Sequence, residues 1–461
     1  MSEDNPLKTG KEVLQVIAAE EKDINQEEEY MHFDYTDGEI PSNIFDKLEL
    51  AKHFIRVSPV YYDEILNFWR WNHFKKRWQI TDETDILNLI HSASGSNIVS
   101  GKERSELLNA VKQVSRKNKP EELKNHIQLA DEIINLQTGE RIKSSPKVFV
   151  TSPIPYSQSI ISDTPTLDKL FNEWVKPEDV QKLYEILAYC IYPAYPIERV
   201  FVLYGSGANG KSCFRQILRK FVGDYNCVSS SLELLSVSRF ETAKLYKKLV
   251  CEMGETNLNT INNTEKIKRL CSGKDLVGAE FKNKKPFDFI NYAKLIISTN
   301  NLPPTEDKTD GWYRKFMIID FPNQFKEEKD ILESIPEQEF HNLAGKCLGI
   351  LDNLLKKKTF SNEGDFNIRR ERYEARSNPV DKFFKDFVAE DAQGDIPKWE
   401  FEKKLNEWLR ENKFRVLSDK SISKILKEKG LHEAVLKKEW FENAAAITKC
   451  FRCWVGIKWT D

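Results

Sequence analysis

Glycines followed by a lysine and a serine form the stretch of this sequence that is best suited to chemistry. The stretch Gly205-Ser-Gly-Ala-Asn-Gly-Lys-Ser has the G-x-x-x-x-G-K-[ST] spacing of a phosphate-binding loop. Glycines let backbone N–H groups turn toward a β-phosphate, and a helix that begins near Lys211 would add its positive end. We expect Lys211 to bridge the β- and γ-phosphates of ATP, and the Ser212 hydroxyl to bind Mg²⁺. The predicted ATP-binding residues are Gly205, Ser206, Gly207, Ala208, Asn209, Gly210, Lys211, Ser212 and Cys213.

Hydrolysis of a triphosphate also needs a carboxylate near the metal, and the segment KKLVCEMGETN contains two. Leu249 to Cys251 has the pattern of an apolar strand, and Glu252 and Glu255 follow it. Ligands of an open α/β sheet bind at the carboxyl ends of the strands, so we expect Glu255, just past the strand, to hold Mg²⁺ and polarise the attacking water. Glu252 is the alternative, and two ordinary surface acids are the simpler interpretation.

Polar residues also lie at one end of each of two further predicted strands: asparagines follow the first and an arginine precedes the second. Lys294 to Ile297 is apolar and leads into Ser-Thr-Asn-Asn, where an amide can orient water or contact a γ-phosphate. Asn300 is the candidate, with Asn301 beside it. Arg314 precedes a further predicted strand, Phe316 to Phe321, and an arginine there often reaches the γ-phosphate bound by a neighbouring subunit. Taken singly, the asparagines could simply belong to a turn after the strand, and the arginine could be an ordinary surface residue.

The order of these four features separates the classes of nucleotide-binding protein. Loop, acidic strand, asparagine strand and arginine follow one another between Gly205 and Arg314. Small-molecule kinases place a lid and a substrate pocket after the loop, and GTPases need an N-K-x-D that is absent near a strand end here. A ring-forming motor ATPase fits all four. A metabolic P-loop kinase and a non-enzymatic DNA-binding or capsid-associated protein are the less favoured alternatives.

In these residues the chain resembles the superfamily 3 helicases, AAA+-related motors that viruses, phages and plasmids encode. More narrowly, it resembles the helicase half of the poxvirus-type and satellite-phage-type primase-helicases. YGSGANGKS is similar to the family's Walker A, KLVCEMGET occupies the place of its Walker B, and LIISTNNLP is similar to motif C with Asn300 as the sensor. DGWYRKFMIIDF is similar to the segment that carries the arginine finger, here Arg314.

This resemblance implies an ATP-dependent DNA helicase that acts in the replication of a mobile element. The active assembly would be a homo-hexameric ring that translocates on single-stranded DNA and unwinds forked duplex. Arg314 would then act on the ATP of the next subunit. A DNA-stimulated ATPase that loads or remodels replication proteins, without processive unwinding, is the main alternative.

The resemblance also implies a hairpin that grips DNA. LCSGKDLVGAEFKNKKPFDF is similar to the family's motif B-prime, after which a basic hairpin projects into the channel of the ring. Lys282, Lys284 and Lys285 would contact DNA, with Lys274 near the base of the hairpin. Three lysines this close together are also typical of a solvated turn. Lys274 stands where the family has a second glycine, and the acidic strand lacks a tight acidic pair, so the Mg²⁺ ligand is not fixed by the pattern.

The patterns predict an α/β protein with an AAA+-like P-loop ATPase core. We expect an acidic, flexible stretch at 1–45, a small mixed α/β region at 46–130, a strand pair with a helical collar at 131–198, the motor at 199–376, and a winged-helix-like unit at 377–461. The collar and the winged helix are implied by the resemblance. In that last unit, a helix from Ser421 would carry lysines on one face, and a solvated helix face is an equal alternative; these lysines are Lys420, Lys424, Lys427 and Lys429, with Lys437 and Lys438 after them.

The first part of the chain is less informative about function. Phe68 to Trp78 interleaves aromatic and basic residues, which suits either base stacking or a hairpin that buries one aromatic face; the hairpin is favoured. Residues 1–125 are too few for the usual primase domain of the resembled family, and His32-Phe33-Asp34 with Asp37 matches a polymerase metal site poorly. A separate primase or polymerase is therefore the expected partner.

Composition limits the compartment and the partners. The 461 residues carry a net charge of -2, so any attraction to nucleic acid must come from local basic patches. No apolar run approaches the roughly 20 residues of a membrane span, and the N-terminus lacks the pattern of a signal peptide. Eight scattered cysteines suit a reducing compartment, and Cys450-x-x-Cys453 fits strand cysteines better than a metal site. We expect a cytoplasmic protein that is not secreted and has no membrane partner.

Overall fold

The computed structural model of the protein describes residues 46–94, 100–130, 132–254, 263–300, 302, 305, 307–326, 331–377, 379–411, 416–442 and 445–460. The chain divides into two compact units. The first unit joins the residues up to Gln158 to a distant segment, Gly278–Phe289, and the second contains Ser159–Val277 and Ile290–Asp461. In the described parts, no helix is long and apolar enough to cross a membrane. The predicted flexible stretch at 1–45 lies outside the described residues.

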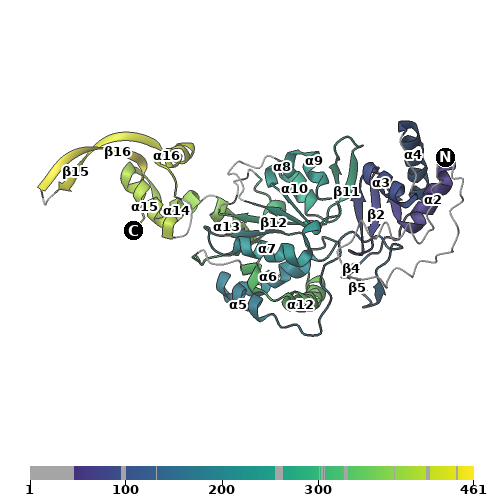
Figure 1. The fold of residues 1–461 in the computed structure, drawn as a ribbon. Coiled ribbons are helices and arrows are strands. Elements are labelled where there is room, and N and C mark those ends of the chain that lie inside the picture. The colour runs from purple at the N-terminus through teal and green to yellow at the C-terminus, as the bar shows by residue number, and fades with distance from the viewer. Residues whose placement is uncertain are drawn as a thin grey trace. The chain divides into compact units, whose positions relative to one another are not determined.

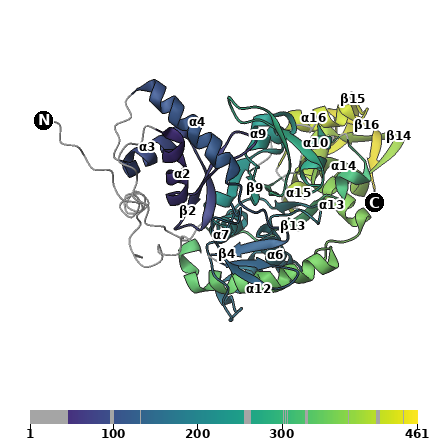
Figure 2. The same ribbon diagram turned by 90° about the vertical axis from the view of Figure 1, so that its right-hand side faces the viewer.

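Helices and short antiparallel sheets form the first unit. Its helices are α2 (Lys47–Val57), α3 (Glu83–Ser94) and α4 (Gly101–Lys117), and its strands are β1 (Val60–Tyr62), β2 (Phe68–Asn72), β3 (Arg77–Thr81), β4 (His126–Leu129), β5 (Glu132–Asn135) and β6 (Arg141–Lys143). The strands pair in the orders β1-β2-β3 and β4-β5-β6. The three helices gather beside β2, and α4 packs along α2 and against β1 (Figure 2).

The aromatic residues of β2 and β3 belong to the core of this unit. Trp69, Trp71 and Trp78 are all at most 3% exposed. The Trp69 indole donates a hydrogen bond to Asp63 at 2.7 Å, and the Trp78 indole donates to the Val148 carbonyl at 3.0 Å. The alternation along a strand sends Phe68 to the helices and the tryptophans to the other face. The predicted burial of the aromatic face is confirmed. The predicted hairpin corresponds to β2 and β3, and β1 adds a third strand to it.

A five-stranded parallel sheet forms the centre of the second unit, which confirms the predicted α/β core. The strand order is β13-β7-β12-β9-β8, and every pairing is parallel. The strands are β7 (Val200–Tyr204), β8 (Cys227–Ser230), β9 (Val250–Met253), β12 (Lys294–Thr299) and β13 (Phe316–Asp320). Every residue of β7, β9 and β12 is buried, as expected of parallel strands that are covered on both faces.

Helices connect and cover these strands (Figure 1). They are α5 (Pro165–Trp174), α6 (Pro177–Cys190), α7 (Lys211–Val222), α8 (Leu232–Val237), α9 (Arg239–Ala243), α10 (Thr264–Leu270), α11 (Asp310–Tyr313), α12 (Glu337–Lys357) and α13 (Phe366–Ser377), with short 3₁₀ helices η2 (Asp224–Asn226) and η3 (Ile331–Ser334). Helix α12 packs along α6 and contacts α5. The carboxylate of Glu339 accepts hydrogen bonds from the N–H groups of Thr166 and Leu167, which satisfies donors at the beginning of α5.

The last part of the chain has a hydrophobic core of its own. Its elements are α14 (Pro379–Phe387), β14 (Val388–Pro397), α15 (Lys398–Glu411), α16 (Asp419–Glu428), β15 (His432–Glu442) and β16 (Ala445–Trp459), with strand order β14-β16-β15. Buried side chains from all three helices meet Trp454 and Ile457 of β16. Strand β14, between the first two helices, is an element that the sequence patterns did not predict.

The lysines of α16 do not all share one face. Lys420, Lys424 and Lys427 line one open groove together with Lys398 and Arg452. Lys429 instead forms an ion pair with Asp381 and lies over the ring of Phe384 at 5.3 Å. The expected set of lysines on one face is therefore wrong for Lys429, because this residue follows the end of the helix and turns toward α14.

The two cysteines near the C-terminus differ in environment. Cys450 is exposed and Cys453 is buried, and the side chains described here include no group of three or more His, Cys, Asp or Glu that could hold a metal ion.

A lysine is buried at the beginning of the central strand β12. Lys294 is 0% exposed, and its ammonium donates to the carbonyls of Tyr192 and Ala194. Its Nζ also lies 4.9 Å from the ring centre of Tyr189. Burial lowers the pKa of Lys294 to about 7, because the charged form loses its hydration.

We predict a pH-dependent difference in stability between the wild type and Lys294→Met. Below about pH 7 the folded protein bears the cost of a buried charge. Above it, folded Lys294 has released its proton while the unfolded chain keeps it up to about pH 10.4, so the wild type gains stability relative to the variant as the pH rises. Urea unfolding at pH 6.5 and pH 9.5 should show a relative gain of up to roughly 3 kcal/mol. A constant difference between the two proteins would contradict the burial of a titrating ammonium.

Candidate functional site

The loop between β7 and α7 has a backbone that depends on glycine. Gly207, Ala208 and Gly210 have φ angles of 101°, 48° and 90°, in the left-handed region that glycine adopts without strain. A Cβ on Gly205 would lie 2.0 Å from the side-chain nitrogen of Asn209 and 2.6 Å from the Phe321 carbonyl. A Cβ on Gly210 would lie 2.6 Å from the ring of Trp174. The spacing of glycines in the motif therefore has a steric cause at both ends of the loop.

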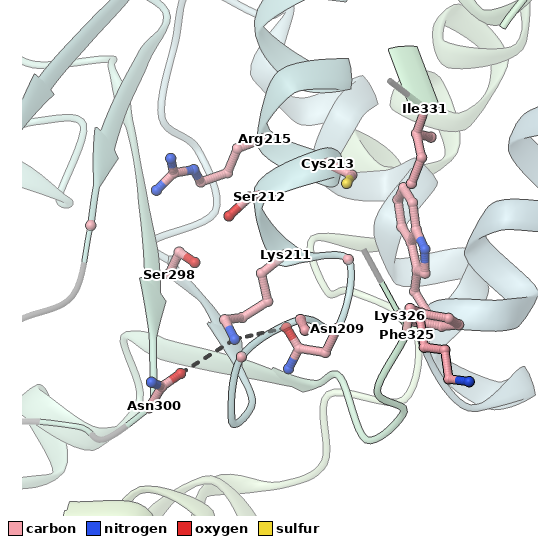
Figure 3. Close-up of a pocket in the computed structure, with 15 residues that line it drawn as sticks. Asn209, Lys211, Ser212, Cys213, Arg215, Ser298, Asn300, Phe325, Lys326 and Ile331 are labelled. Atoms are coloured by element: carbon pink, nitrogen blue, oxygen red, sulfur yellow. Dashed lines mark hydrogen bonds between the residues drawn. The ribbon is translucent and has the colours of Figure 1, made fainter. Parts of the chain in front are cut away.

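Lys211 is the side chain that ties the loop together. Its Nζ donates to the Gly205 carbonyl at 2.6 Å, to Asn209 Oδ1 at 2.8 Å and to Asn300 Oδ1 at 3.4 Å (Figure 3). Lys211 is only 7% exposed, so these oxygens take the place of water around the charge. An ammonium held by neutral oxygens is ready to exchange them for the oxygens of an anion such as a phosphate.

The loop opens onto a cavity of about 550 Å³. Its lining includes the predicted nucleotide-binding residues from Gly207 to Cys213, together with Ser298 and Asn300 of the β12 end. Strands β7 and β12 are parallel neighbours, with Tyr204 paired to Thr299, and this register brings the loop and Asn300 to the same edge of the sheet. The structure thus brings Lys211, Ser212 and Asn300 together, as the sequence predicted. Asn301 lies outside the described residues.

Two walls of the cavity were not predicted from the sequence. The segment after β13 crosses the loop: Phe325 N–H donates to the Ala208 carbonyl at 2.7 Å, and the Gln324 amide donates to the Ser206 hydroxyl at 3.1 Å. Trp174, at the end of α5, lines the cavity beside Gly210 and is 1% exposed. Both contacts join residues that are far apart in sequence, so no local pattern signals them.

The acidic strand places its first glutamate away from this cavity. Glu252 lies within β9 and is 3% exposed, and its carboxylate pairs with Arg219 of α7 at 2.5 Å. Arg219 comes eight residues after Lys211, or about 12 Å along the helix. Glu252 is absent from the cavity lining, which includes Gly254 just past the strand. One carboxylate oxygen of Glu252 is thus held by Arg219, while Oε1 is buried without a hydrogen-bond partner among the described residues. Glu252 stays the alternative Mg²⁺ ligand, and Glu255 lies outside the described residues.

Arg314 lies at the opposite edge of the sheet from the loop. In the β13–β7 register, Phe316 pairs with Val200 at the amino end of β7, while the loop follows Tyr204 at the carboxyl end. These ends are separated by the length of a five-residue strand, roughly 13 Å. Arg314 is 57% exposed and lies 3.7 Å from Glu198, which Lys315 holds at 2.6 Å. Arg314 therefore does not reach the loop of its own chain.

The predicted DNA-binding lysines lie on a hairpin but are not equivalent. Strands β10 (Leu276–Ala279) and β11 (Phe287–Ile290) pair with each other. Lys282 and Lys285 in the connecting loop are exposed, and so is Lys274 before β10. Lys284 instead donates to the Leu66 carbonyl at 2.9 Å and to Asn67 Oδ1 at 2.5 Å within the first unit, where burial lowers its pKa.

Comparison with known proteins finds similarity over parts of the chain. A family of unknown function (DUF5906) matches residues 203–315, which span the loop, the acidic strand, Asn300 and Arg314. A stretch of 184 residues is 26% identical to the protein named "Putative helicase L207/L206" of Acanthamoeba polyphaga mimivirus. That stretch is 37% of this chain and 19% of the viral protein, so the chain spans about a fifth of its relative. The chain is thus distantly similar to a viral protein that is named as a helicase.

Solved structures of the NrS-1 C-terminal region align with most of the chain. One apo structure aligns with a TM-score of 0.47 at 14% identity and covers 90% of this chain and 100% of the other. A second structure, the A form of the apo protein, aligns with a TM-score of 0.44 at 13% identity. This alignment covers 89% of this chain and 100% of the NrS-1 chain.

We predict that Gly205→Ala will weaken nucleotide binding at least tenfold. The added methyl group would clash with both the Asn209 side chain and the Phe321 carbonyl, and Asn209 is one of the partners that hold Lys211. Gly349→Ala is the matched control, because a Cβ on this residue of α12 meets nothing within 4 Å. Alanine in a helix should raise the stability of this control by up to about 1 kcal/mol and leave binding unchanged. Titration with a fluorescent ATP analogue measures the affinity of each variant. Equal affinities of the two variants would contradict the steric role of Gly205.

Proposed function

We propose that this chain is an ATP-dependent DNA helicase of a mobile genetic element, whose copies form a ring on single-stranded DNA. One observation carries the proposal: the loop with Lys211 lies at the carboxyl ends of the strands of the parallel sheet, and the exposed Arg314 lies at their amino ends. An ATPase site that uses both side chains therefore needs two copies, which is the arrangement of a ring motor. The distant similarity to a viral protein named as a helicase supports the class of activity.

Each side chain at the loop would take one part of the hydrolysis. On binding a triphosphate, Lys211 would exchange the Gly205 carbonyl and Asn209 for phosphate oxygens. Ser212 and Glu255 would hold Mg²⁺, which offsets the charge of the phosphates when it is bound. Asn300, released by Lys211, would orient the attacking water. Arg314 of the adjoining copy would stabilise the charge that develops on the transferred phosphate.

The remaining parts would bind DNA and partners. The exposed Lys282 and Lys285 of the hairpin would contact the backbone of one DNA strand, with Lys274 nearby. Successive hydrolysis around a hexamer would move these hairpins along the strand. Under this proposal the central sheet is an AAA+-like motor, the helices α5 and α6 are its collar, and the C-terminal unit is winged-helix-like. A separate primase or polymerase would complete the replication machinery.

One observation favours a second candidate, an ATPase that loads or remodels proteins on DNA without processive unwinding. Lys284, at the centre of the lysine group, is already bound by Leu66 and Asn67, so it is not available to a DNA strand in this conformation. A hairpin that is fixed in this way would pass the conformational change caused by hydrolysis to the first unit and not to DNA.

Strand displacement on a forked duplex separates the two candidates. We predict that the wild type displaces the strand with ATP and Mg²⁺, and that Lys211→Ala loses at least 99% of this activity, because the loop loses its only ammonium near the β- and γ-phosphates. Lys220→Ala is the matched control, since Lys220 lies on the same helix but pairs with Glu337 outside the cavity. DNA-stimulated hydrolysis without strand displacement would favour the remodelling ATPase. A hydrolysis rate that does not change when DNA is added would contradict both candidates.

A further inference from the structure

Arg215 is a cation in the cavity to which the sequence motifs assign no function. It lies one turn after Lys211 on α7 and lines the same cavity. Its Nε is buried without a hydrogen-bond partner, and no hydrogen bond or ion pair engages its guanidinium in the part of the chain that the structure describes. A buried donor without a partner costs roughly 1–3 kcal/mol, more when charged, so such a group in a native structure calls for an explanation.

The other arginines around the central sheet show what a structural role looks like. Arg219, one turn further along α7, pairs with Glu252 at 2.5 Å. Arg376 of α13 binds both oxygens of Asp320, at 2.6 and 2.8 Å. Arg199 binds Glu363 through two nitrogens at 2.9 Å. Arg215 differs from all three because it pairs with no carboxylate among the described residues and faces a cavity that already contains the ammonium of Lys211.

Two cations that face one cavity indicate an anion that bridges them. Residues four apart on a helix share a face, so Arg215 lies one turn further along α7 than Lys211, on the side that lines the cavity. Its guanidinium lies on the side of the loop where Ser212, Ser298 and Asn300 are found (Figure 3). Phe325, Lys326 and Ile331 lie on the other side of Lys211 (Figure 3).

This layout gives the cavity a direction. A nucleoside suits the side with Phe325 and Ile331, because these side chains offer apolar surface. The phosphate chain would then run across Lys211 toward Asn300, with its last phosphate beside Arg215. We propose that Arg215 binds the terminal phosphate of the triphosphate in its own subunit and makes the cavity select triphosphates over diphosphates. The inference rests on the proposed nucleotide site but adds a residue and a selectivity that the motifs do not contain.

The chemistry of the guanidinium fits this role. It is planar, permanently charged and presents parallel N–H donors that match two oxygens of one phosphate. Lys211 acts as a point charge between two phosphates, whereas Arg215 can contact the last phosphate with a fork of donors. A diphosphate would leave Arg215 as it is in the nucleotide-free protein, so the contact would contribute to triphosphate binding alone.

Binding measurements on Arg215→Gln test the inference. With Mg²⁺, we expect the affinity for a triphosphate analogue with a β,γ-imido bridge to fall about tenfold, and the affinity for ADP to change less than twofold. The melting temperature of the nucleotide-free protein should not fall, because the side chain has no hydrogen-bond or ion-pair partner in the described ranges to lose. Arg215→Lys should recover part of the selectivity, since it keeps the charge but not the fork. Gln216→Ala, the exposed neighbour on α7, should behave as the wild type.

Other outcomes are distinguishable. An equal loss for the triphosphate and for ADP, or no loss for either, would overturn the role of Arg215 while the nucleotide site itself stands. A lower melting temperature without a change in selectivity would assign Arg215 to the fold and also overturn it. If the wild type binds neither nucleotide, the proposed function fails, and the inference fails with it.

Discussion

The parallel pairing of β7 with β12 and β13 is the constraint on which the rest of the candidate site depends. Parallel strands have all their carboxyl ends at one edge of the sheet, so the segments that follow them converge there. The loop after Tyr204, Asn300 after Thr299 and the covering segment after Asp320 meet at this edge for that reason alone. The same constraint sends the residues before each strand to the other edge, which is where Arg314 and its partner Glu198 lie. One sheet therefore separates the two halves of the proposed ATPase site.

Steric fit then fixes the loop at that edge. Gly205 leaves room for the Asn209 amide and the Phe321 carbonyl, which are hydrogen-bonded to each other at 3.0 Å. Gly210, directly before α7, leaves room for the ring of Trp174 from the end of α5. Lys211 closes the ring of contacts by binding Gly205 and Asn209 on its own loop and Asn300 on the next strand. Without a ligand the ammonium thus holds the loop in shape, and a phosphate would compete for the same donor.

Local sequence patterns predicted the parts of this site that depend on local geometry. The apolar runs located β9, β12 and β13 within a few residues, because strands buried on both faces consist almost entirely of apolar side chains. The glycine spacing predicted the loop, because left-handed φ angles restrict the residue types. Trp174, the segment at Phe325 and the pairing of Glu252 with Arg219 were not predictable in this way, since each depends on how distant segments pack. Arg215 had a local signal, the i+4 spacing from Lys211, but this spacing gains meaning only because no partner engages Arg215 in the part of the chain that the structure describes.

In the proposed ring, one copy contributes the loop and another contributes the arginine. Mixing Lys211→Ala with Arg314→Ala tests this arrangement most directly, with DNA-stimulated ATP hydrolysis as the readout. One variant carries a large mass tag, so that mass photometry can verify that mixed assemblies form. Each variant alone should be inactive. In a mixture, an intact loop from the Arg314→Ala copy can meet an intact arginine from the Lys211→Ala copy, so we expect partial recovery of hydrolysis that peaks near equal amounts. No recovery at any ratio, in assemblies that contain both variants, would contradict a shared site.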